Sequence, residues 1–216
     1  MLIVAYILIA LAGYLLGSIP TGYLVARAKG MDIRTVGSGN IGATNAFRVL
    51  GKPAGVFVLL TDALKGWLAV WVVAVWILNT LLPSDSSDAM RTFAAIIAGL
   101  FAVVGHNYPC WLNFKGGKGI ATSAGVLVAL VPWALIIILS VWIILVLTTR
   151  YVSIGSIAAA VVLPFATWFT TRHDVALTIV TGALGAMAIY KHKGNLQRLF
   201  AGTESRFNFK RKETAP

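Results

Sequence analysis

The chain has 216 residues, 58% of them hydrophobic and only 12% charged, and its mean hydropathy is +0.84. Because a water-soluble domain carries roughly 25% charged residues, this composition excludes an ordinary soluble enzyme and indicates an integral membrane protein. The only cysteine is Cys110, which excludes an internal disulfide and suggests no thiolate metal cluster.

Apolar stretches long enough to cross a membrane recur along the chain. About 20 apolar residues in a helix span the hydrocarbon core of a bilayer, which is about 30 Å thick. The first stretch lacks the basic leader and small-residue cleavage site of a signal peptide, so we expect it to be a retained helix. The apolar stretches, in chain order, are residues 2–24, 54–82, 93–105, 119–148, 152–169 and 174–190.

The formal net charge of +11 is spread unevenly, with 14 of the 18 lysines and arginines in three polar stretches. These are residues 25–52, residues 106–119 and the tail from residue 190. Short positive loops stay in the cytoplasm, so the sequence predicts that all three face the cytoplasm and that the linker 83–91 faces outward. Residues 208–216 are predicted to be a flexible basic tail that contacts anionic lipid.

The basic stretches also constrain the number of crossings, because an even number must separate residues 106–119 from the tail. Pro132 cannot donate the helical hydrogen bond, and a break there divides residues 119–130 from residues 132–148. The prediction is an all-α integral membrane protein of seven transmembrane helices, with the N-terminus outside, the C-terminus cytoplasmic and a single domain over residues 1–216. Residues 119–130 would extend only about 18 Å as a helix, so a five-crossing arrangement with this segment re-entrant stays open.

The first polar stretch contains the glycine-rich motif Gly37-Ser38-Gly39-Asn40-Ile41-Gly42-Ala43-Thr44-Asn45-Ala46-Phe47-Arg48. Its glycines let backbone amides approach an anion closely, and Ser38, Thr44 and Asn45 add side-chain hydrogen bonds. Arg48 can grip a phosphate with two parallel hydrogen bonds. Residues 43–49 are predicted to form a short helix whose amino end points at the anion. No Walker loop occurs in the sequence, so nucleotide hydrolysis is disfavoured.

The second polar stretch contains Phe114-Lys115-Gly116-Gly117-Lys118-Gly119-Ile120-Ala121-Thr122, preceded by His106. The glycines lead directly into the helical run from Ile120, an arrangement that holds a phosphate on helix amides with Lys118 as counter-ion. The alternative for Lys115 and Lys118 is a topological role alone, as positive charges that keep the loop in the cytoplasm.

In the tail, His192, Asn195 and Arg198 are spaced to lie on roughly one face of a helix, and Glu204 follows them. His106, His192 and Glu204 are each candidates for a general base, and the alternative is that each orients a neighbour through a hydrogen bond. The histidines lie far apart in sequence and have no companion carboxylate cluster, so a catalytic zinc site is disfavoured.

Two charged residues, Asp62 and Lys65, lie three residues apart inside the second apolar stretch. Charges at that depth are costly and usually face the protein interior. The sequence leaves open whether they form a structural ion pair beside the site or contact a substrate. Ser153 and Ser156 follow a predicted membrane edge, where small residues usually pack helices together.

Together, these motifs resemble those of the bacterial acyl-phosphate:glycerol-3-phosphate acyltransferases. The resemblance is carried by Ser-Gly-Asn-x-Gly-Ala-Thr-Asn…Arg at 38–48, Gly-His…Pro…Phe-Lys-Gly-Gly-Lys-Gly-x-Ala-Thr at 105–122 and His-x-x-Asn-x-x-Arg…Gly-x-Glu at 192–204. It extends from about residue 15 to residue 207, nearly the whole chain. Three ordered motifs at comparable spacing make the resemblance highly specific.

The resemblance implies a seven-helix enzyme of the bacterial cytoplasmic (inner) membrane whose active site faces the cytoplasm. It implies transfer of a fatty acyl group from acyl phosphate to the sn-1 hydroxyl of glycerol 3-phosphate. The products would be lysophosphatidic acid and phosphate, in the first acylation of phospholipid synthesis. The enzyme is expected to work among membrane lipid with no cofactor, no metal, no nucleic acid and no obligate protein partner.

The resemblance also suggests roles for residues. The expected catalytic residues are Ser38, Arg48, Lys118, His192 and Asn195, which would hold glycerol 3-phosphate, with His192 orienting. Gly116, Gly117, Gly119 and Thr122 are expected to hold acyl phosphate, whose own oxygen would take the hydroxyl proton; His192 or Glu204 is the alternative base. The full set of expected substrate-binding residues is Gly39, Asn40, Thr44, Asn45, His106, Lys115, Gly116, Gly117, Gly119, Thr122, Ser156, Arg198 and Glu204.

Other classes of protein fit parts of the pattern. A transporter would explain the helices and anion-binding loops, but transporters place substrate near the bilayer midplane, usually with internal symmetry, and no repeat is visible. A non-catalytic scaffold could bind anionic lipid through its tail alone. An alcohol phosphotransferase would need clustered aspartates for a metal, whereas Asp32 and Asp62 stand alone.

Overall fold

The computed structural model describes residues 1–81 and 87–207, and this part of the chain is helical without a strand. The predicted basic tail, residues 208–216, lies outside the described residues. The helices are α1 (Leu2–Ser18), α2 (Thr21–Arg27), α3 (Ala43–Leu50), α4 (Lys52–Leu68), α5 (Val75–Leu81), α6 (Asp88–Asn107), α7 (Ile120–Leu130), α8 (Pro132–Thr149), α9 (Val152–Thr170), α10 (Val175–Lys191) and α11 (Lys193–Phe200). A π-helical segment, Ala69–Ala74, joins α4 to α5.

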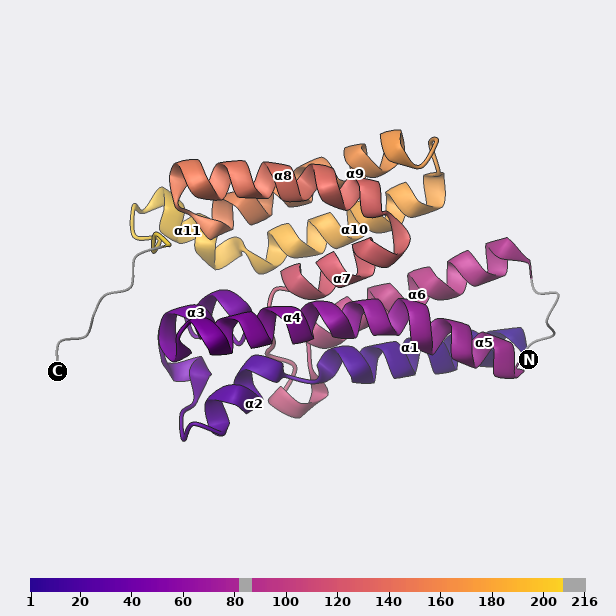
Figure 1. Ribbon diagram of the computed structural model, residues 1–216, viewed down its shortest axis with the longest axis horizontal. Coiled ribbons are helices and arrows are strands. Elements are labelled where there is room, and N and C mark those ends of the chain that lie inside the picture. Colours follow the sequence, from indigo (N-terminus) through magenta and orange to yellow (C-terminus); the bar gives the residue numbers. More distant parts are fainter. Residues whose placement is uncertain (82–86, 208–216) are drawn as a thin grey trace.

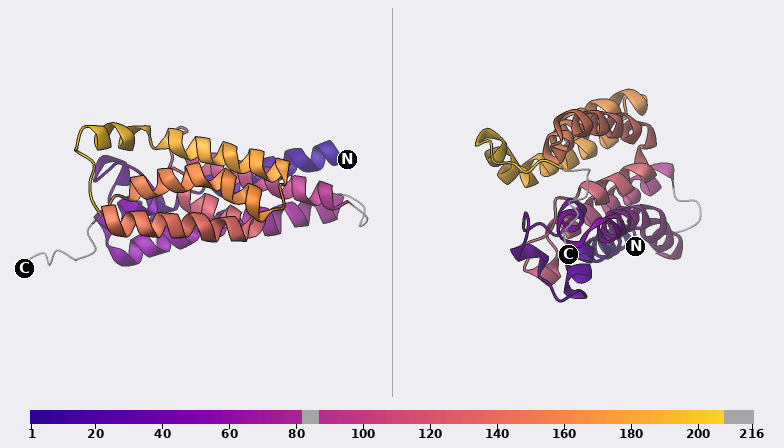
Figure 2. Two further views of the ribbon diagram at one scale, coloured as in Figure 1. Left: turned by 90° about the horizontal axis from the view of Figure 1, so that it is seen from above. Right: turned by 60° about the vertical axis from the view of Figure 1, so that its left-hand side comes forward.

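The long helices lie side by side in an elongated bundle with two groups (Figures 1 and 2). One group holds α1, α4, α5 and α6, and the other holds α8, α9 and α10; the shorter α7 lies between them (Figure 1). The main contacts join α1 to α6, α8 to α9, α9 to α10 and α4 to α7. Val126 and Leu127 of α7 are buried in the central hydrophobic core, so α7 links the two groups.

The described helices confirm the all-α membrane fold class. Five of them are long and apolar enough to cross a membrane by themselves or with a continuing segment: Leu2–Arg27, Lys52–Leu81, Asp88–Leu112, Pro132–Thr149 and Val152–Thr170. Val175–Lys191 passes the same test together with Lys193–Phe200, across a bend of 52°, and Ile120–Leu130 is a shorter apolar helix. The number of crossings and the orientation of the termini stay predictions.

Two prolines interrupt the apolar stretches, and only one break was predicted. The expected break at Pro132 is confirmed, because α7 ends at Leu130 and α8 begins at Pro132. Residues 2–24, however, are not one helix: α1 ends at Ser18, and Ile19 leaves the helical region with ψ 111° before Pro20. A residue that precedes proline avoids the helical region, and proline itself donates no hydrogen bond.

Glycines allow the closest helix contacts. A Cβ on Gly125 of α7 would lie 1.8 Å from a carbonyl oxygen of α4, and a Cβ on Gly66 of α4 would lie 2.2 Å from a carbonyl oxygen of α7. Gly17 and Gly105 make the same kind of contact between α1 and α6. Because small residues let membrane helices approach closely, these glycines set the positions of α6 and α7, from which the second motif loop extends.

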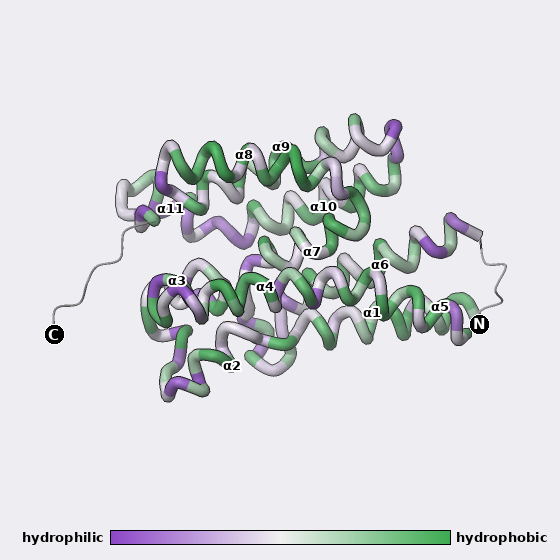
Figure 3. The backbone as a smooth tube through the Cα atoms, in the orientation of Figure 1, coloured by the Kyte–Doolittle hydropathy of each residue, from purple (hydrophilic) through white to green (hydrophobic). Residues whose placement is uncertain are grey.

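Hydrophobic residues follow the long helices, and hydrophilic residues gather around α3, α11 and the neighbouring loops (Figure 3). We call this the motif end of the bundle. All three sequence motifs lie there, since α3 carries the first, the loop before α7 carries the second and α11 carries the third.

We expect Gly125→Ala to lower the free energy of unfolding by about 3 kcal/mol or more, because the added methyl group has no space unless α7 moves away from α4. Gly182→Ala in α10 is the matched control: its Cβ would make an ordinary 3.8 Å contact with Pro164, and alanine favours the helix. Thermal unfolding in detergent measures both variants. Equal melting temperatures would contradict the close α4–α7 contact.

Candidate active site

The three motifs, far apart in sequence, meet around one cavity of about 330 Å³ at the motif end. We call it the polar cavity. The sequence-predicted residues that line it are Ser38, Asn40, Thr44, Asn45, Arg48, His106, Lys118, Gly119, Ser156, His192, Asn195, Arg198 and Glu204. The three motifs therefore lie around a single cavity, which one reaction that uses all three would need.

Asn45 organises the first motif loop from inside. Its side-chain oxygen accepts the amide hydrogen of Ser38 at 2.9 Å, and its side-chain nitrogen donates to the carbonyls of Ile33, Val36 and Asn40. Only 1% of Asn45 is exposed. Because both ends of the carboxamide are used in these bonds, Asn45 shapes the loop that presents Ser38.

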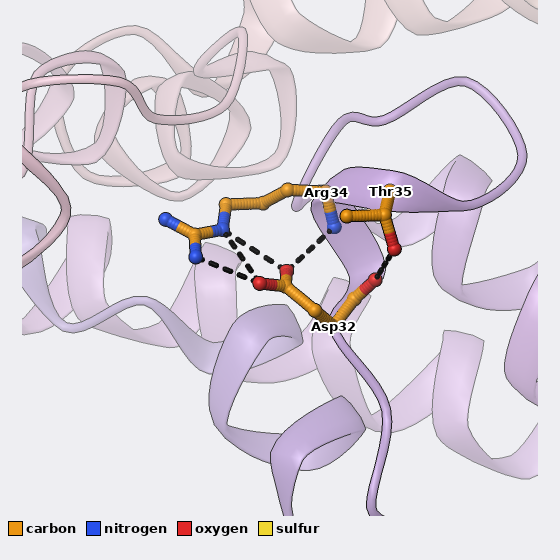
Figure 4. A network of polar contacts seen from close by, with 3 residues as sticks. All are labelled: Asp32, Arg34 and Thr35. Atoms are coloured by element: carbon orange, nitrogen blue, oxygen red, sulfur yellow. Dashed lines mark hydrogen bonds and ion pairs between the residues drawn. The ribbon is translucent and has the colours of Figure 1, made fainter.

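A surface turn braces the same loop (Figure 4). Asp32 accepts hydrogen bonds from the side chain and backbone N–H of Arg34, and the Thr35 hydroxyl donates to the Asp32 carbonyl. The Arg34 side chain, then its backbone N–H, lower the pKa of Asp32 to about 2. The carboxylate is therefore ionised at neutral pH, and Asp32 is committed to this turn and lies outside the polar cavity.

Helix α3 points its amino end at the polar cavity, as predicted. Gly42 is its N-cap, and the Gly42 amide is held by the Asn40 side chain at 2.8 Å. Gly42, Ala43 and Thr44 all line the cavity, so the first amides of the helix, which have no partner inside the helix, lie where an anion would bind. Arg48 is exposed one turn further along and also lines the cavity.

The second motif contributes fewer contacts to the polar cavity than predicted. The amides of Gly116 and Gly117 donate to the carbonyls of Asn107 and His106, at 3.2 and 3.0 Å, so they are already occupied. A Cβ on Gly117 would lie 2.0 Å from the His106 ring, so this glycine gives room to the imidazole. The structure does not bring Gly39, Lys115, Gly116, Gly117 or Thr122 to the cavity lining.

Lys118 is the cation that the second motif does bring to the cavity. Its ammonium group donates a hydrogen bond to the side-chain oxygen of Asn195, which joins the second motif to the third. Burial lowers the pKa of Lys118 to about 8; Glu204 acts in the opposite direction, while Arg198 and Arg48 lower it further. The ammonium group of Lys118 therefore loses its proton more readily than that of an ordinary lysine, and a bound anion would stabilise its charge.

Glu204 is the centre of the third motif. Its carboxylate accepts hydrogen bonds from Asn195 at 2.6 Å, from Arg198 at 2.7 Å and from Ser153 at 2.8 Å. Burial raises the pKa of Glu204, but the hydrogen bonds from Asn195, Arg198 and Ser153 outweigh burial, and the pKa is lowered overall. The lowered pKa makes the carboxylate a weak base, and its oxygens already accept three hydrogen bonds, which suits an orienting group better than a proton acceptor.

His192 is buried between α10 and α11. Its Nδ1 lies 2.8 Å from the Ala188 carbonyl oxygen, and since a carbonyl only accepts, Nδ1 must carry the hydrogen. The neutral ring then presents Nε2 as its acceptor. Because His192 lines the polar cavity, this nitrogen is available to orient a hydroxyl group.

Asp62 and Lys65 form the buried ion pair that the sequence left open, at 2.8 Å. Asp62 also lies 3.6 Å from Nδ1 of His106, and both residues line the floor of the polar cavity. The Lys65 ammonium donates to the carbonyl of Ile19 at 2.8 Å, where proline interrupts the first apolar stretch. The Lys65 side chain therefore connects Asp62, which lines the polar cavity, to the break between α1 and α2.

Sequence reasoning missed two contributions to the site. Trp142 on α8 lines the polar cavity and donates its indole N–H to Ser156 at 3.2 Å, but a tryptophan in a uniformly apolar helix gives no sequence signal. Ser153 was expected to pack helices, whereas its hydroxyl binds Glu204. A search for polar residues within one turn of a predicted membrane edge would have found Ser153.

An inner apolar cavity of about 220 Å³ extends from the polar cavity between α7, α8, α9 and α10. The two cavities share Leu59, Ile120, Ala121, Trp142 and Ser156. Its walls include Leu127, Ile138 and Leu163. A polar chamber that continues into an apolar slot suits a molecule with an anionic head and a hydrocarbon chain.

The fold and the site thus define an integral membrane protein with a polar cavity that continues into an apolar slot at one end of a helical bundle. The family model described as glycerol-3-phosphate acyltransferase matches residues 7–202, and the chain belongs to this family of acyltransferases. The resemblance of the motifs is confirmed. The chain is 41% identical over 202 residues to glycerol-3-phosphate acyltransferase 1 of Rhizobium johnstonii, covering 93% of this chain and 91% of that protein.

Two solved structures of PlsY, an integral membrane glycerol 3-phosphate acyltransferase, are also similar. The glycerol 3-phosphate form has a TM-score of 0.81 at 38% identity and covers 94% of this chain and 96% of that chain. The lysophosphatidic acid form has a TM-score of 0.78 at 37% identity and covers 94% of this chain and 95% of that chain.

Asp62→Asn is expected to lower the free energy of unfolding by about 3 kcal/mol, because it leaves the buried Lys65 ammonium without its counter-charge. Adding Lys65→Met to Asp62→Asn should recover most of that loss, since neither charge then remains. Thermal unfolding in detergent tests both. A double variant no more stable than Asp62→Asn would show that the charges are not coupled.

Proposed function

We propose that this protein transfers a fatty acyl group from acyl phosphate to the sn-1 hydroxyl of glycerol 3-phosphate, giving lysophosphatidic acid and inorganic phosphate. The observation that carries the proposal is the meeting of three cation- and amide-bearing motifs at one cavity that continues into an apolar slot. Membership of the family supports it, as does the similarity to PlsY in its glycerol 3-phosphate and lysophosphatidic acid forms.

Glycerol 3-phosphate binds on the α3 side of the polar cavity in this proposal. Ser38 and the first amides of α3 hold its phosphate, and Arg48 supplies the counter-charge. Gly39, Asn40 and Thr44 complete the loop around it. Asn195 and His192 orient the glycerol hydroxyls, and Arg198 with Glu204 fixes Asn195.

Acyl phosphate binds on the α7 side. Its chain occupies the inner apolar cavity, and its phosphate lies at Gly119 and the first amides of α7, beside Lys118. Gly119 has φ +78°, a backbone conformation that side chains resist, and this turn directs the chain into α7. Ser156 lines both cavities at the point where head and chain of the donor meet.

The remaining second-motif residues act through the shape of this loop. The amides of Gly116 and Gly117 bind the loop to the carbonyls at the end of α6, and the His106 ring packs against Gly117. Thr122 packs α7 against α4, because its carbonyl lies against Gly66. Lys115 is exposed and acts as a positive charge at the membrane surface.

The sn-1 oxygen attacks the acyl carbonyl carbon, the bond from that carbon to the phosphate oxygen breaks, and inorganic phosphate leaves with the hydroxyl proton. An acyl phosphate is already activated, so no covalent acyl-enzyme is needed. Holding the two reactants in line supplies roughly 7–11 kcal/mol, and each donor to the developing oxyanion, Lys118 among them, contributes about 3 kcal/mol. The lowered pKa of Glu204 makes its carboxylate a weak base, which favours the leaving phosphate over Glu204 as proton acceptor.

The protein is proposed to lie in the bacterial cytoplasmic membrane with seven transmembrane helices and the polar cavity on the cytoplasmic side. The basic residues of the motif end support this orientation. A cavity at the end of the bundle also fits an enzyme better than a transporter, whose site lies near the bilayer midplane. Residues 1–216 are proposed to act as one domain without an obligate protein partner.

The direct test combines purified protein, acyl phosphate and labelled glycerol 3-phosphate, with lysophosphatidate scored as product. Acyl-CoA serves as the comparison donor, and a metal chelator is added in a parallel reaction. We expect product from acyl phosphate alone, unaffected by the chelator. Product from acyl-CoA at an equal rate would replace the proposed donor.

Lys118→Ala, Arg48→Ala, Ser38→Ala and Asn195→Ala should each lower kcat/KM by roughly a hundredfold or more, because each removes a group that lines the polar cavity. Lys115→Ala is the matched control, a lysine of the same loop that is exposed and lies outside the cavity. Steady-state kinetics in detergent measure all five. Equal losses in Lys115→Ala and Lys118→Ala would place the substrate elsewhere.

The pKa of Lys118, lowered to about 8 mainly by burial, predicts an alkaline limit to activity. As pH rises above that value the unbound enzyme loses this cation, so kcat/KM for glycerol 3-phosphate should fall. Lys118→Arg should move the fall beyond the accessible range, since a guanidinium stays charged. A pH profile of kcat/KM provides the measurement, and an unchanged alkaline limb in Lys118→Arg would assign the limb to another group.

A further inference from the structure

A third cavity, of about 280 Å³, lies between α3 and α4 on one side and α8 and α9 on the other. We call it the side cavity. Its lining is apolar apart from Thr44 and the indole of Trp142. The proposed reaction does not use it, because the chain of the donor already has the inner apolar cavity.

The side cavity opens toward lipid. Ile143 and Leu147 of α8 line it and are 43% and 61% exposed on the apolar surface of the bundle. Helices α4 and α8 belong to different groups, with α7 between the groups (Figure 1). A hydrocarbon chain in the side cavity would therefore pass into the bilayer without crossing water.

The side cavity is also continuous with the reaction site. It shares Thr44, Val152 and Phe207 with the polar cavity. Leu59 and Trp142 line all three cavities, so they form the divide between the inner apolar cavity and the side cavity. The Trp142 indole is held there by its hydrogen bond to Ser156.

The polar end of the side cavity is covered. The amide of Phe207 donates to the Arg150 carbonyl at 2.6 Å, and its ring meets the ring of Phe47 edge to face at 6.4 Å. These contacts join the turn before α9 to α3. Ile143 and Leu147 stay exposed on the lateral face toward lipid, which suits a chain that leaves sideways while its headgroup stays at the membrane surface.

We propose that the side cavity is the exit site for the acyl chain of lysophosphatidate, an inference that rests on the proposed function. Before transfer the chain is tied to the phosphate on the α7 side. After transfer it is tied to the glycerol phosphate on the α3 side, and α3 forms one wall of the side cavity. The chain then passes Leu59 and Trp142 into the side cavity and on into lipid.

The test fills the side cavity with Ile143→Trp. Ile144→Trp is the matched control, because Ile144 is the next residue of the same helix, is 59% exposed and lines none of the three cavities. Both variants are placed in lipid vesicles, and the single-turnover rate of acyl transfer is compared with steady-state turnover. Ile143→Trp should keep the single-turnover rate within about twofold and lower steady-state turnover roughly tenfold, because only product departure is blocked.

Butyryl phosphate gives a second measurement, since its water-soluble product needs no lipid path; with this donor Ile143→Trp should match wild type. Two results would overturn the proposal: equal rates for Ile143→Trp and Ile144→Trp in both regimes, or an equal loss of single-turnover and steady-state rates, which would make the side cavity a donor site. Failure of wild type to form lysophosphatidate in either regime would instead contradict the proposed function.

Discussion

The site depends on the hydrogen-bonded carboxylate of Glu204. Arg48, Lys118 and Arg198 all line the polar cavity, and three cations around one cavity repel one another. Glu204 binds Arg198 directly and reaches Lys118 through Asn195, so one negative charge holds the second and third motifs together. It offsets the positive charge only in part. Burial is the main cause of the lowered pKa of Lys118, and the remaining positive charge of Arg198 and Arg48 lowers it further; a phosphate dianion would neutralise that charge on binding.

Rigid backbone, rather than side chains alone, keeps these charges in place. Asn45 fastens the first loop through four hydrogen bonds, and the carbonyls at the end of α6 fasten the second. The glycine contacts at α1–α6 and α4–α7 in turn fix those helices. A reaction between two bound reactants gains most of its rate from such positioning, which explains why so many motif residues contact the protein and not the cavity.

Local chemistry made part of this predictable from sequence. The break at Pro132, the short helix after Gly42 and the gathering of charge in three stretches all follow from single residues and their neighbours. Gly116 and Gly117 were expected to cradle phosphate, but a glycine that gives room to a distant ring looks the same in sequence as one that binds an anion. Asn45 has the same ambiguity. The partner of each lies elsewhere in the chain, and no spacing rule identifies it.

The transfer itself imposes a constraint that a single apolar slot does not meet. In the proposed reaction the acyl chain begins bound to one phosphate and ends bound, through glycerol, to another on the opposite side of the polar cavity. If the chain stayed in the slot between α7 and α10, the product would span the cavity and block the next donor. The proposed reaction therefore calls for a lipid-facing path on the acceptor side, and Leu59 and Trp142, which line all three cavities, lie where the proposed path begins.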